Sequence, residues 1–226
     1  MKKRTAFVGA ILSLIPLGQP LIIKTGLVLS SSALMISLSE KLNAADNSFY
    51  FNRAYEKAAK GDHYGAISDY TKVIEMNPKD ASAYYNRAFS KEKLKDYYGA
   101  ISDYTKAIEI DPNKDEAYYN RGTIKSKSLN DHEGGLLDLN KAIKINSYDS
   151  DYYGNRGIMK KKLGDYYGAI SDYNKAIKMN PTNQVDVHNR GNAKYLIGDI
   201  QGACNDWRKA YSLGDEVAAT SVRKYC

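Results

Sequence analysis

The dipeptide Asn-Arg recurs along the chain at an almost constant interval, and no other feature constrains the fold as strongly. It occurs five times, with spacings of 34, 34, 35 and 34 residues. The surrounding residues return as well, so the sequence divides into five units: 47–80, 81–114, 115–149, 150–183 and 184–217. The third unit contains one extra residue within Lys125–Asn130. A period of this length predicts stacked copies of one structural unit that share a continuous core.

Each unit has the pattern of two helices joined by a short turn. The first helix should begin near the second residue of the unit, and a Gly-Asp or Lys-Asp pair then interrupts it, as at Gly61-Asp62 and Lys95-Asp96. Asp is a favourable N-cap for the helix that follows. In three units the second helix ends at a proline, which cannot continue a helix: Pro78, Pro112 and Pro181.

This period and layout resemble the tetratricopeptide repeat (TPR) family. Position 8 of the unit is always small: Ala54, Ala88, Gly122, Gly157 and Gly191. Position 24 is mostly aromatic: Tyr70, Tyr104, Leu139, Tyr173 and Trp207. The resemblance implies an all-α, right-handed superhelical solenoid of five helix-turn-helix repeats. The tail Glu216–Cys226, of which residues 218–226 lie beyond the fifth repeat, would form the capping helix that a solenoid end requires.

The first helix of each unit has a packing side and an opposite side, which we call the groove face. The groove face carries positions 2, 5, 6, 9 and 13. Position 6 is Asn in every unit: Asn52, Asn86, Asn120, Asn155 and Asn189. Aromatic and basic residues accompany this row: Tyr85, Phe89, Tyr119, Lys93, Lys127 and Lys162.

In the TPR family this face lines the concave groove, and the resemblance implies that the Asn row can grip the main chain of an extended peptide. One Asn amide offers a donor and an acceptor, which match one peptide unit. Aromatic side chains supply rigid contact area, and the Lys row favours acidic side chains or a carboxylate. The alternative is that the Asn side chains support the helix and the aromatic rings pack on the neighbouring repeat. That alternative is favoured for Phe51 and Tyr55.

One known TPR site is not expected. The carboxylate clamp of chaperone-binding TPR proteins needs Lys at position 5 and basic residues at positions 2 and 6, and these positions do not match here.

A second pair of repeated residues predicts structural ion pairs. Position 7 is Arg in every unit: Arg53, Arg87, Arg121, Arg156 and Arg190. Position 23 is Asp in every unit: Asp69, Asp103, Asp138, Asp172 and Asp206. A partly buried Arg needs a partner, and an Asp on the facing helix can supply it. We expect these residues to pair within a repeat or between adjacent repeats and to fix the helix geometry.

Residues 1–45 differ in composition from the rest of the chain. A basic start, an apolar run over residues 6–23 and small residues near Ala44 predict a secretory signal that is cleaved after Ala44. The alternative is an uncleaved membrane anchor formed by residues 6–23. The C-terminal stretch GACNDWRKAYSLGDEVAA also resembles the ending of exported bacterial TPR proteins. We therefore expect export to a bacterial periplasm or an equivalent lumen, with or without a membrane anchor.

The two cysteines, Cys204 and Cys226, are consistent with export. A disulfide persists in an oxidising compartment, so the pair can tie down the last helix. The alternative is two small buried thiols.

Composition and motif content disfavour several other functions. The net charge of +7 includes +4 from residues 1–45, which leaves the repeats nearly neutral and without a nucleic-acid-binding block. The three histidines are scattered, and no phosphate-binding loop, metal-ligand spacing or nucleophile motif occurs. We expect no catalytic residues, no cofactor and no metal.

The sequence thus predicts a non-catalytic scaffold of the cell envelope that binds an extended peptide or partner segment in the concave groove. The alternative is a structural or assembly factor that self-associates or docks folded partners through its convex side, where a row of lysines lies: Lys72, Lys106, Lys141, Lys175 and Lys209.

Overall fold

The computed structural model describes residues 21–22, 28–29 and 31–226. Two short strands, β1 (Leu21–Ile22) and β2 (Val28–Leu29), pair antiparallel with Leu21 opposite Leu29. All other regular structure in these described residues is α-helical. The helices are α2 (Ser31–Ala59), α3 (His63–Met76), α4 (Ala81–Lys93), α5 (Tyr97–Ile110), α6 (Asp115–Ser128), α7 (His132–Ile145), α8 (Ser150–Lys162), α9 (Tyr166–Met179), α10 (Gln184–Leu196), α11 (Ile200–Ser212) and α12 (Glu216–Tyr225).

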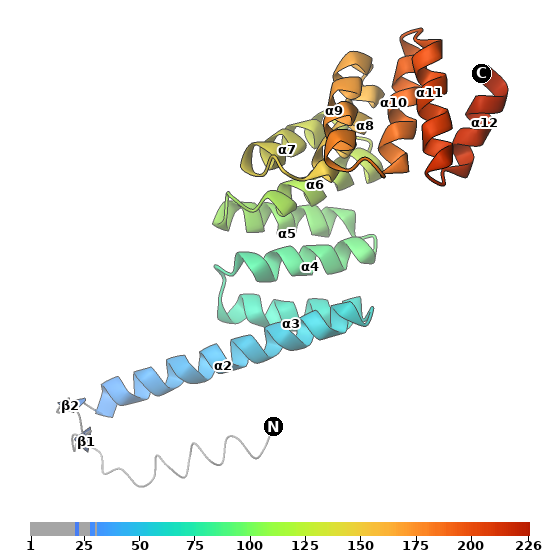
Figure 1. Ribbon diagram of the computed structural model, residues 1–226. Coiled ribbons are helices and arrows are strands. Elements are labelled where there is room, and N and C mark those ends of the chain that lie inside the picture. Colours follow the sequence, from blue (N-terminus) through green and yellow to red (C-terminus); the bar gives the residue numbers. More distant parts are fainter. Residues whose placement is uncertain (1–20, 23–27, 30) are drawn as a thin grey trace.

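The helices stack in chain order, each packed against the one before it (Figure 1). Even-numbered helices from α2 to α10 are the first helices of the repeats, and odd-numbered helices from α3 to α11 are the second. The direction of the helices turns along the stack, so α10 and α11 stand across the direction of α3 to α5 (Figure 1). The predicted all-α solenoid of helix-turn-helix repeats is confirmed.

The start of each second helix is fixed by one local motif. Its N-cap Asp accepts a hydrogen bond of 2.8–3.0 Å from the backbone N–H three residues later, which belongs to a glycine in all five repeats. A Cβ added to that glycine would lie 2.0–2.1 Å from the Asp carboxylate. The capping geometry therefore requires the Asp-x-x-Gly spacing, and the cap satisfies one of the unpaired N–H groups of the helix.

The interior of each repeat is built from the small and aromatic positions. Tyr70, Tyr104, Leu139, Tyr173 and Trp207 are at most 2% exposed. Each ring or side chain fills the space left by a small residue on the first helix. A Cβ added to Gly157, for example, would lie 2.7 Å from Cε1 of Tyr173. Larger residues at position 8 would force these helices apart.

The extra residue of the third repeat is absorbed at the end of α6. That helix has 14 residues, whereas α4, α8 and α10 have 13. The N–H of Leu129 bonds to the C=O of Ile124, and the N–H of Asp131 bonds to the C=O of Lys125. Asn130 then takes a left-handed φ of 58°, as Lys95 does in the second repeat. The widened last turn leaves the capping Asp131 in place, so the stacking continues.

The first and last helices differ from the rest. α2 begins at Ser31 rather than near residue 48, since residues 31–46 contain neither Gly nor Pro to interrupt a helix. The proposed cleavage point after Ala44 therefore lies within α2, and cleavage remains a prediction. Most of the candidate anchor, residues 6–23, lies outside the described residues. In the described part, no helix is both long enough and apolar enough to cross a bilayer.

α12 caps the C-terminal end of the stack (Figure 1). A disulfide joins Cys204 of α11 to Cys226, with the two Cα atoms 5.7 Å apart. A hydrogen bond also joins His188 of α10 to Asp215, the N-cap of α12. The cap is thus held at both of its ends.

Candidate functional site

The Arg and Asp rows meet within each repeat. All five Arg side chains make two hydrogen bonds of 2.6–2.9 Å to both oxygens of the Asp in the same repeat. The Asp residues are only 2–5% exposed. Two parallel bonds to a guanidinium satisfy a buried carboxylate, and they connect the two helices of the repeat. The Arg53 hydrogen bonds lower the pKa of Asp69 to about 2.

A lysine that the sequence analysis did not identify forms an ion pair with the Asp of each Arg-Asp pair. Position 11 is Lys in every repeat, and its ammonium lies 2.7–2.9 Å from the same carboxylate: Lys57, Lys91, Lys125, Lys160 and Lys194. The signal was present, since this Lys recurs as regularly as the Arg. Position 11 lies on the packing side, where a partly buried lysine is stabilised by a neighbouring buried acid.

The same Arg side chains also connect adjacent repeats. Arg87 and Arg121 donate to the hydroxyls of Thr71 and Thr105, at 3.1 and 3.0 Å. Arg156 donates to Asn140 at 2.9 Å, and Arg190 follows the same pattern. The network therefore acts within and between repeats. The expected pairing is present, and the effect of both rows on the helix geometry stays a prediction.

The Asn row on the groove face is ordered by its own amide groups. The Nδ2 of Asn120 donates to the hydroxyl of Tyr85 at 3.0 Å, and that of Asn155 donates to Tyr119 at 3.0 Å. The Nδ2 of Asn86 donates to the C=O of Ser82 at 2.8 Å. No hydrogen bond from any described residue reaches the Oδ1 atoms of these three amides. Asn120 and Asn155 thus connect adjacent repeats through their NH₂ groups, whereas Asn86 bonds only within its own helix, and all three present a free acceptor.

The ends of the Asn row differ from its centre. Asn52 is exposed and makes no hydrogen bond to another described side chain. The Oδ1 of Asn189 accepts a hydrogen bond from Lys161 at 2.8 Å.

The aromatic residues of the groove face divide into two kinds. Tyr85 and Tyr119 are half-buried, and their rings lie 5.6 Å from Tyr104 and 4.9 Å from Tyr152. They pack within the stack, as the structural alternative expects, and burial raises the pKa of Tyr119 to about 12. Phe89 is 37% exposed, with the Lys93 ammonium 4.7 Å from its ring centre. Its ring is therefore open to a ligand.

The first repeat departs from the expectation at one residue. Phe51 packs on Tyr70 with the ring centres 5.6 Å apart, as expected. Tyr55 was expected to pack as well, but it is 62% exposed. Position 9 points away from the core, so Tyr55 lies open on the groove face next to the repeat that carries Phe89.

The basic residues of the groove face are open. Lys93, Lys127 and Lys162 are exposed, and none pairs with a carboxylate among the described residues. Lys161, which precedes Lys162, differs because it is partly buried. Burial lowers the pKa of its ammonium, and its hydrogen-bond partner is the neutral amide of Asn189. A desolvated cation without a counter-ion is costly, so this position favours an anionic ligand group.

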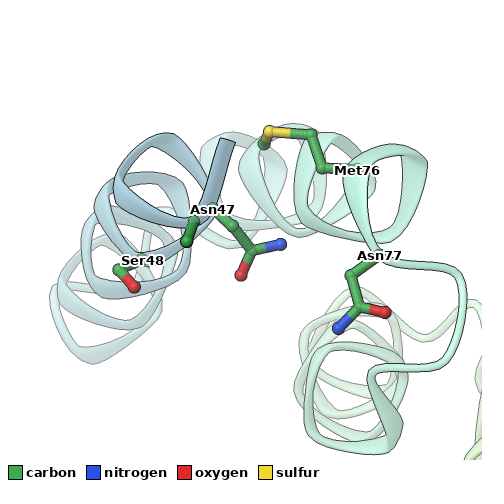
Figure 2. A pocket seen from close by; sticks show the side chains of 5 residues that line it. Asn47, Ser48, Met76 and Asn77 are labelled. Atoms are coloured by element: carbon green, nitrogen blue, oxygen red, sulfur yellow. The ribbon is translucent and has the colours of Figure 1, made fainter. Parts of the chain in front are cut away.

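A small hollow lies apart from these rows, at one end of α3. It is lined by Ala44, Asn47, Ser48, Met76 and Asn77 and has a volume of about 290 Å³ (Figure 2). The amide of Asn47 donates to the C=O of Val73 at 3.3 Å. The lining carries no charged side chain and none of the Asn row, so we do not assign the candidate site to it.

The potential metal ligands among the described residues do not gather at one place. No group of three His, Cys, Asp or Glu side chains in that part of the chain is placed to hold a metal ion. The three histidines lie in different repeats, and His188 is engaged with Asp215.

Comparison with known protein families agrees with this arrangement. Tetratricopeptide repeat profiles match residues 48–80, 81–114 and 150–183. This chain belongs to the TPR family. TPR proteins bind protein or peptide partners and are generally non-catalytic scaffolds. Comparison with the sequences of curated proteins gives no match.

Solved TPR structures share the fold. MamA superimposes with a TM-score of 0.70 at 24% identity, covering 78% of this chain and 96% of MamA. YrrB, described as a TPR protein with an unusual peptide-binding site, superimposes with a TM-score of 0.69 at 21% identity. The match covers 77% of this chain and 90% of YrrB. PilW, a type IV pilus biogenesis factor, superimposes with a TM-score of 0.65 at 21% identity. The match covers 74% of this chain and 77% of PilW. At these identities the likeness establishes the solenoid fold.

Proposed function

We propose that this TPR protein is a non-catalytic scaffold that binds an extended, acidic segment of a partner protein along its groove face. The observation that carries this proposal is the row of oriented amides at Asn86, Asn120 and Asn155. Each donates from its NH₂ group to a group of this protein, and no hydrogen bond from a described residue reaches its oxygen. An extended peptide has N–H groups that such acceptors can bind, whatever its side chains are.

The flanking residues favour particular peptide side chains. The open rings of Tyr55 and Phe89 provide apolar contact area toward the N-terminal end of the groove face. Lys93 beside Phe89, the exposed Lys127 and Lys162, and Lys161 provide positive charge along the groove face. A segment with acidic residues along its length and apolar residues at one end fits this distribution. YrrB provides a precedent for peptide binding on this fold.

We place the scaffold outside the cytoplasm, in the cell envelope. Two features support this location: the signal-like composition of residues 1–45 and the disulfide between Cys204 and Cys226. Thiol titration of the denatured, unreduced protein from its native source checks the location. We expect no free thiols, and two free thiols would contradict both the bond and the location.

The test of peptide binding compares three baits in pull-downs from source cells, read by mass spectrometry. The first is the wild-type chain and the second carries Asn86→Ala, Asn120→Ala and Asn155→Ala. The matched control carries Ser68→Ala, Ser102→Ala and Ser171→Ala, which are exposed on the second helices. All three must give the same circular dichroism spectrum.

The proposal expects a partner that the wild type and the Ser control retain and the Asn variant loses. A synthetic peptide from that partner should then compete for binding. If the Asn variant retains every partner, the Asn row is purely structural and the proposal is wrong.

A second function is favoured by the five exposed lysines on the second helices, Lys72 to Lys209. In that case the protein is an assembly factor that docks folded partners on its convex side. Failure of all peptides to compete, with retained binding of a folded partner, would support this function.

A further inference from the structure

The outer faces of the last three second helices form a strongly basic surface. Five lysines on α7, α9 and α11 are exposed and pair with no carboxylate among the described residues; we call them the basic strip: Lys141, Lys144, Lys175, Lys178 and Lys209. The acids of these helices are mostly withdrawn from the surface. Asp138, Asp172 and Asp206 are buried in the ion pairs described above, and the exposed Glu133 lies in the opposite end turn of α7.

The first two repeats show that this charge imbalance is not a property of the fold. Glu75 and Glu109 occupy the positions that Lys144 and Lys178 take later in the chain. The ammonium of Lys106 lies 2.6 Å from the Glu109 carboxylate. Charge is therefore balanced on α3 and α5 and one-sided from α7 onward.

Apolar side chains lie next to the basic strip. Leu137 is 69% exposed and precedes Lys141 by one helical turn, so both lie on the same face of α7 as Lys144. Tyr167 is 74% exposed and lies two turns before Lys175 on α9, at a position where α3 and α5 also carry exposed tyrosines, so Leu137 is the apolar residue that distinguishes the strip. Lysines on a helix face with a large apolar residue beside them can bind a membrane interface.

The helices that carry the basic strip are connected by hydrogen bonds from arginines of the intervening helices α8 and α10. Arg156 joins α7 to α9 through Asn140, at 2.9 Å, and Asp172, at 2.6 Å. Arg190 joins α9 to α11 in the same way. These helices follow one another along the C-terminal part of the stack, with α8 and α10 packed between them (Figure 1). Binding to one extended anionic surface requires the five ammonium groups to act together, and the strip variant described below tests whether they do.

We propose that the basic strip binds the anionic headgroup surface of a lipid bilayer, with Leu137 and Tyr167 entering the interface. The lysine ammonium is a point charge on a flexible chain and lacks the planar, bidentate geometry of the arginine guanidinium. Lysine therefore suits many loosely arranged phosphate groups better than one fixed carboxylate. Each lysine near such a surface contributes to attraction that salt weakens. This contact leaves the groove face free, so the proposal does not depend on peptide binding.

The test is co-sedimentation of the full chain with vesicles of phosphatidylcholine alone or with about 30% phosphatidylglycerol added. The strip variant carries Lys→Gln at Lys141, Lys144, Lys175 and Lys178. The control variant carries Lys→Gln at Lys60, Lys72, Lys79 and Lys106, which are also exposed. Both variants lose the same charge and keep residues 1–45, so the N-terminal segment contributes equally to each.

We expect the wild type and the control to prefer anionic vesicles and to lose that preference in high salt. The strip variant should partition onto anionic vesicles at least about tenfold less than the control. Leu137→Ser should weaken binding to a smaller extent and leave its salt dependence unchanged.

Three results would overturn the proposal. The wild type could fail to prefer anionic vesicles, which would leave an acidic protein as the partner of this surface. The two Lys variants could lose binding equally, which would show an effect of net charge alone. The strip variant could bind as well as the wild type, which would assign binding to another segment.

Discussion

The first three repeats and the last two share one scaffold but present different surfaces. The Arg-Asp-Lys network, the capping Asp and the small residue at position 8 recur from end to end. On the groove face, the first three repeats carry Tyr55, Phe89 and half-buried tyrosines, whereas the last two carry Gly154, His188 and the partly buried Lys161. The comparison shows that the positions that repeat build the solenoid. The positions that vary between repeats would give the proposed binding its specificity.

The largest expected effect is a loss of stability, and it tests whether the Arg-Asp pairs play the same role in the first three repeats and in the last two. Arg87→Met and Arg156→Met each leave a buried Asp without its guanidinium, and the two Arg side chains are 15% and 17% exposed. Each variant should lose about 3 kcal/mol of unfolding free energy, measured by urea denaturation. Unchanged stability would contradict the structural role, and clearly unequal losses would contradict a common scaffold.

Reduction of the disulfide should affect only the C-terminal half. The bond closes a loop between residues 22 apart in sequence, and its loss should cost about 3 kcal/mol in that part of the chain. Trp207 is the only tryptophan and lies 5.8 Å from the ring of Tyr225, so its fluorescence reports on the cap. Dithiothreitol should lower the unfolding midpoint of the wild type. The Cys226→Ser variant should not respond to it.

A buried acid in the last repeat predicts a pH dependence that the earlier interior repeats lack. Position 3 is Asp186 in the last repeat but Ala83 and Ala117 in the second and third. Burial raises the pKa of Asp186 to about 6, so the folded state favours the protonated carboxyl. Protonation of Asp186 therefore stabilises the folded state fully below about pH 4, the pKa of the carboxyl in the unfolded chain. This stabilisation is lost as the pH rises through about 6, the pKa in the folded state.

Asp186→Asn should therefore stabilise the protein by about 2 kcal/mol at pH 7.5 and leave it almost unchanged at pH 4. Thermal unfolding at both pH values measures this difference. The exposed Glu133→Gln serves as the control and should show no such difference. An equal shift of Asp186→Asn at the two pH values would show that burial of the charge is not the cause.

The smallest expected effect sharpens the contrast within the groove face. Lys161→Met should weaken the binding of an acidic partner peptide by about tenfold, or about 1.4 kcal/mol, because the peptide carboxylate loses the desolvated ammonium as its partner. Fluorescence anisotropy of the labelled peptide measures the loss. The exposed neighbour Lys162→Met should weaken binding less. Equal effects of the two variants would mean that only general charge matters at this end.

Much of the fold followed from the sequence because repetition is itself structural information. Five copies of one pattern identified the helices, their turns and the Arg-Asp pairs, since a local rule that holds in one unit holds in all. Position 11 carried the same signal, and its lysines could have been placed beside the Asp row. Helix α2 could not be bounded in this way, because its start at Ser31 lies outside the repeated pattern.

The candidate site depended on tertiary structure to a greater degree. The sequence by itself determined which residue types lie on the groove face, because helical periodicity sorts them by side. Only the stacking of repeats decided that Asn120 and Asn155 turn their NH₂ groups to tyrosines of the preceding repeat and leave their oxygens open. Only the stacking left Lys161 partly buried without an acid. Hydrogen bonds and burial across repeats depend on distances between residues about 35 apart, and spacing in the sequence cannot supply those distances.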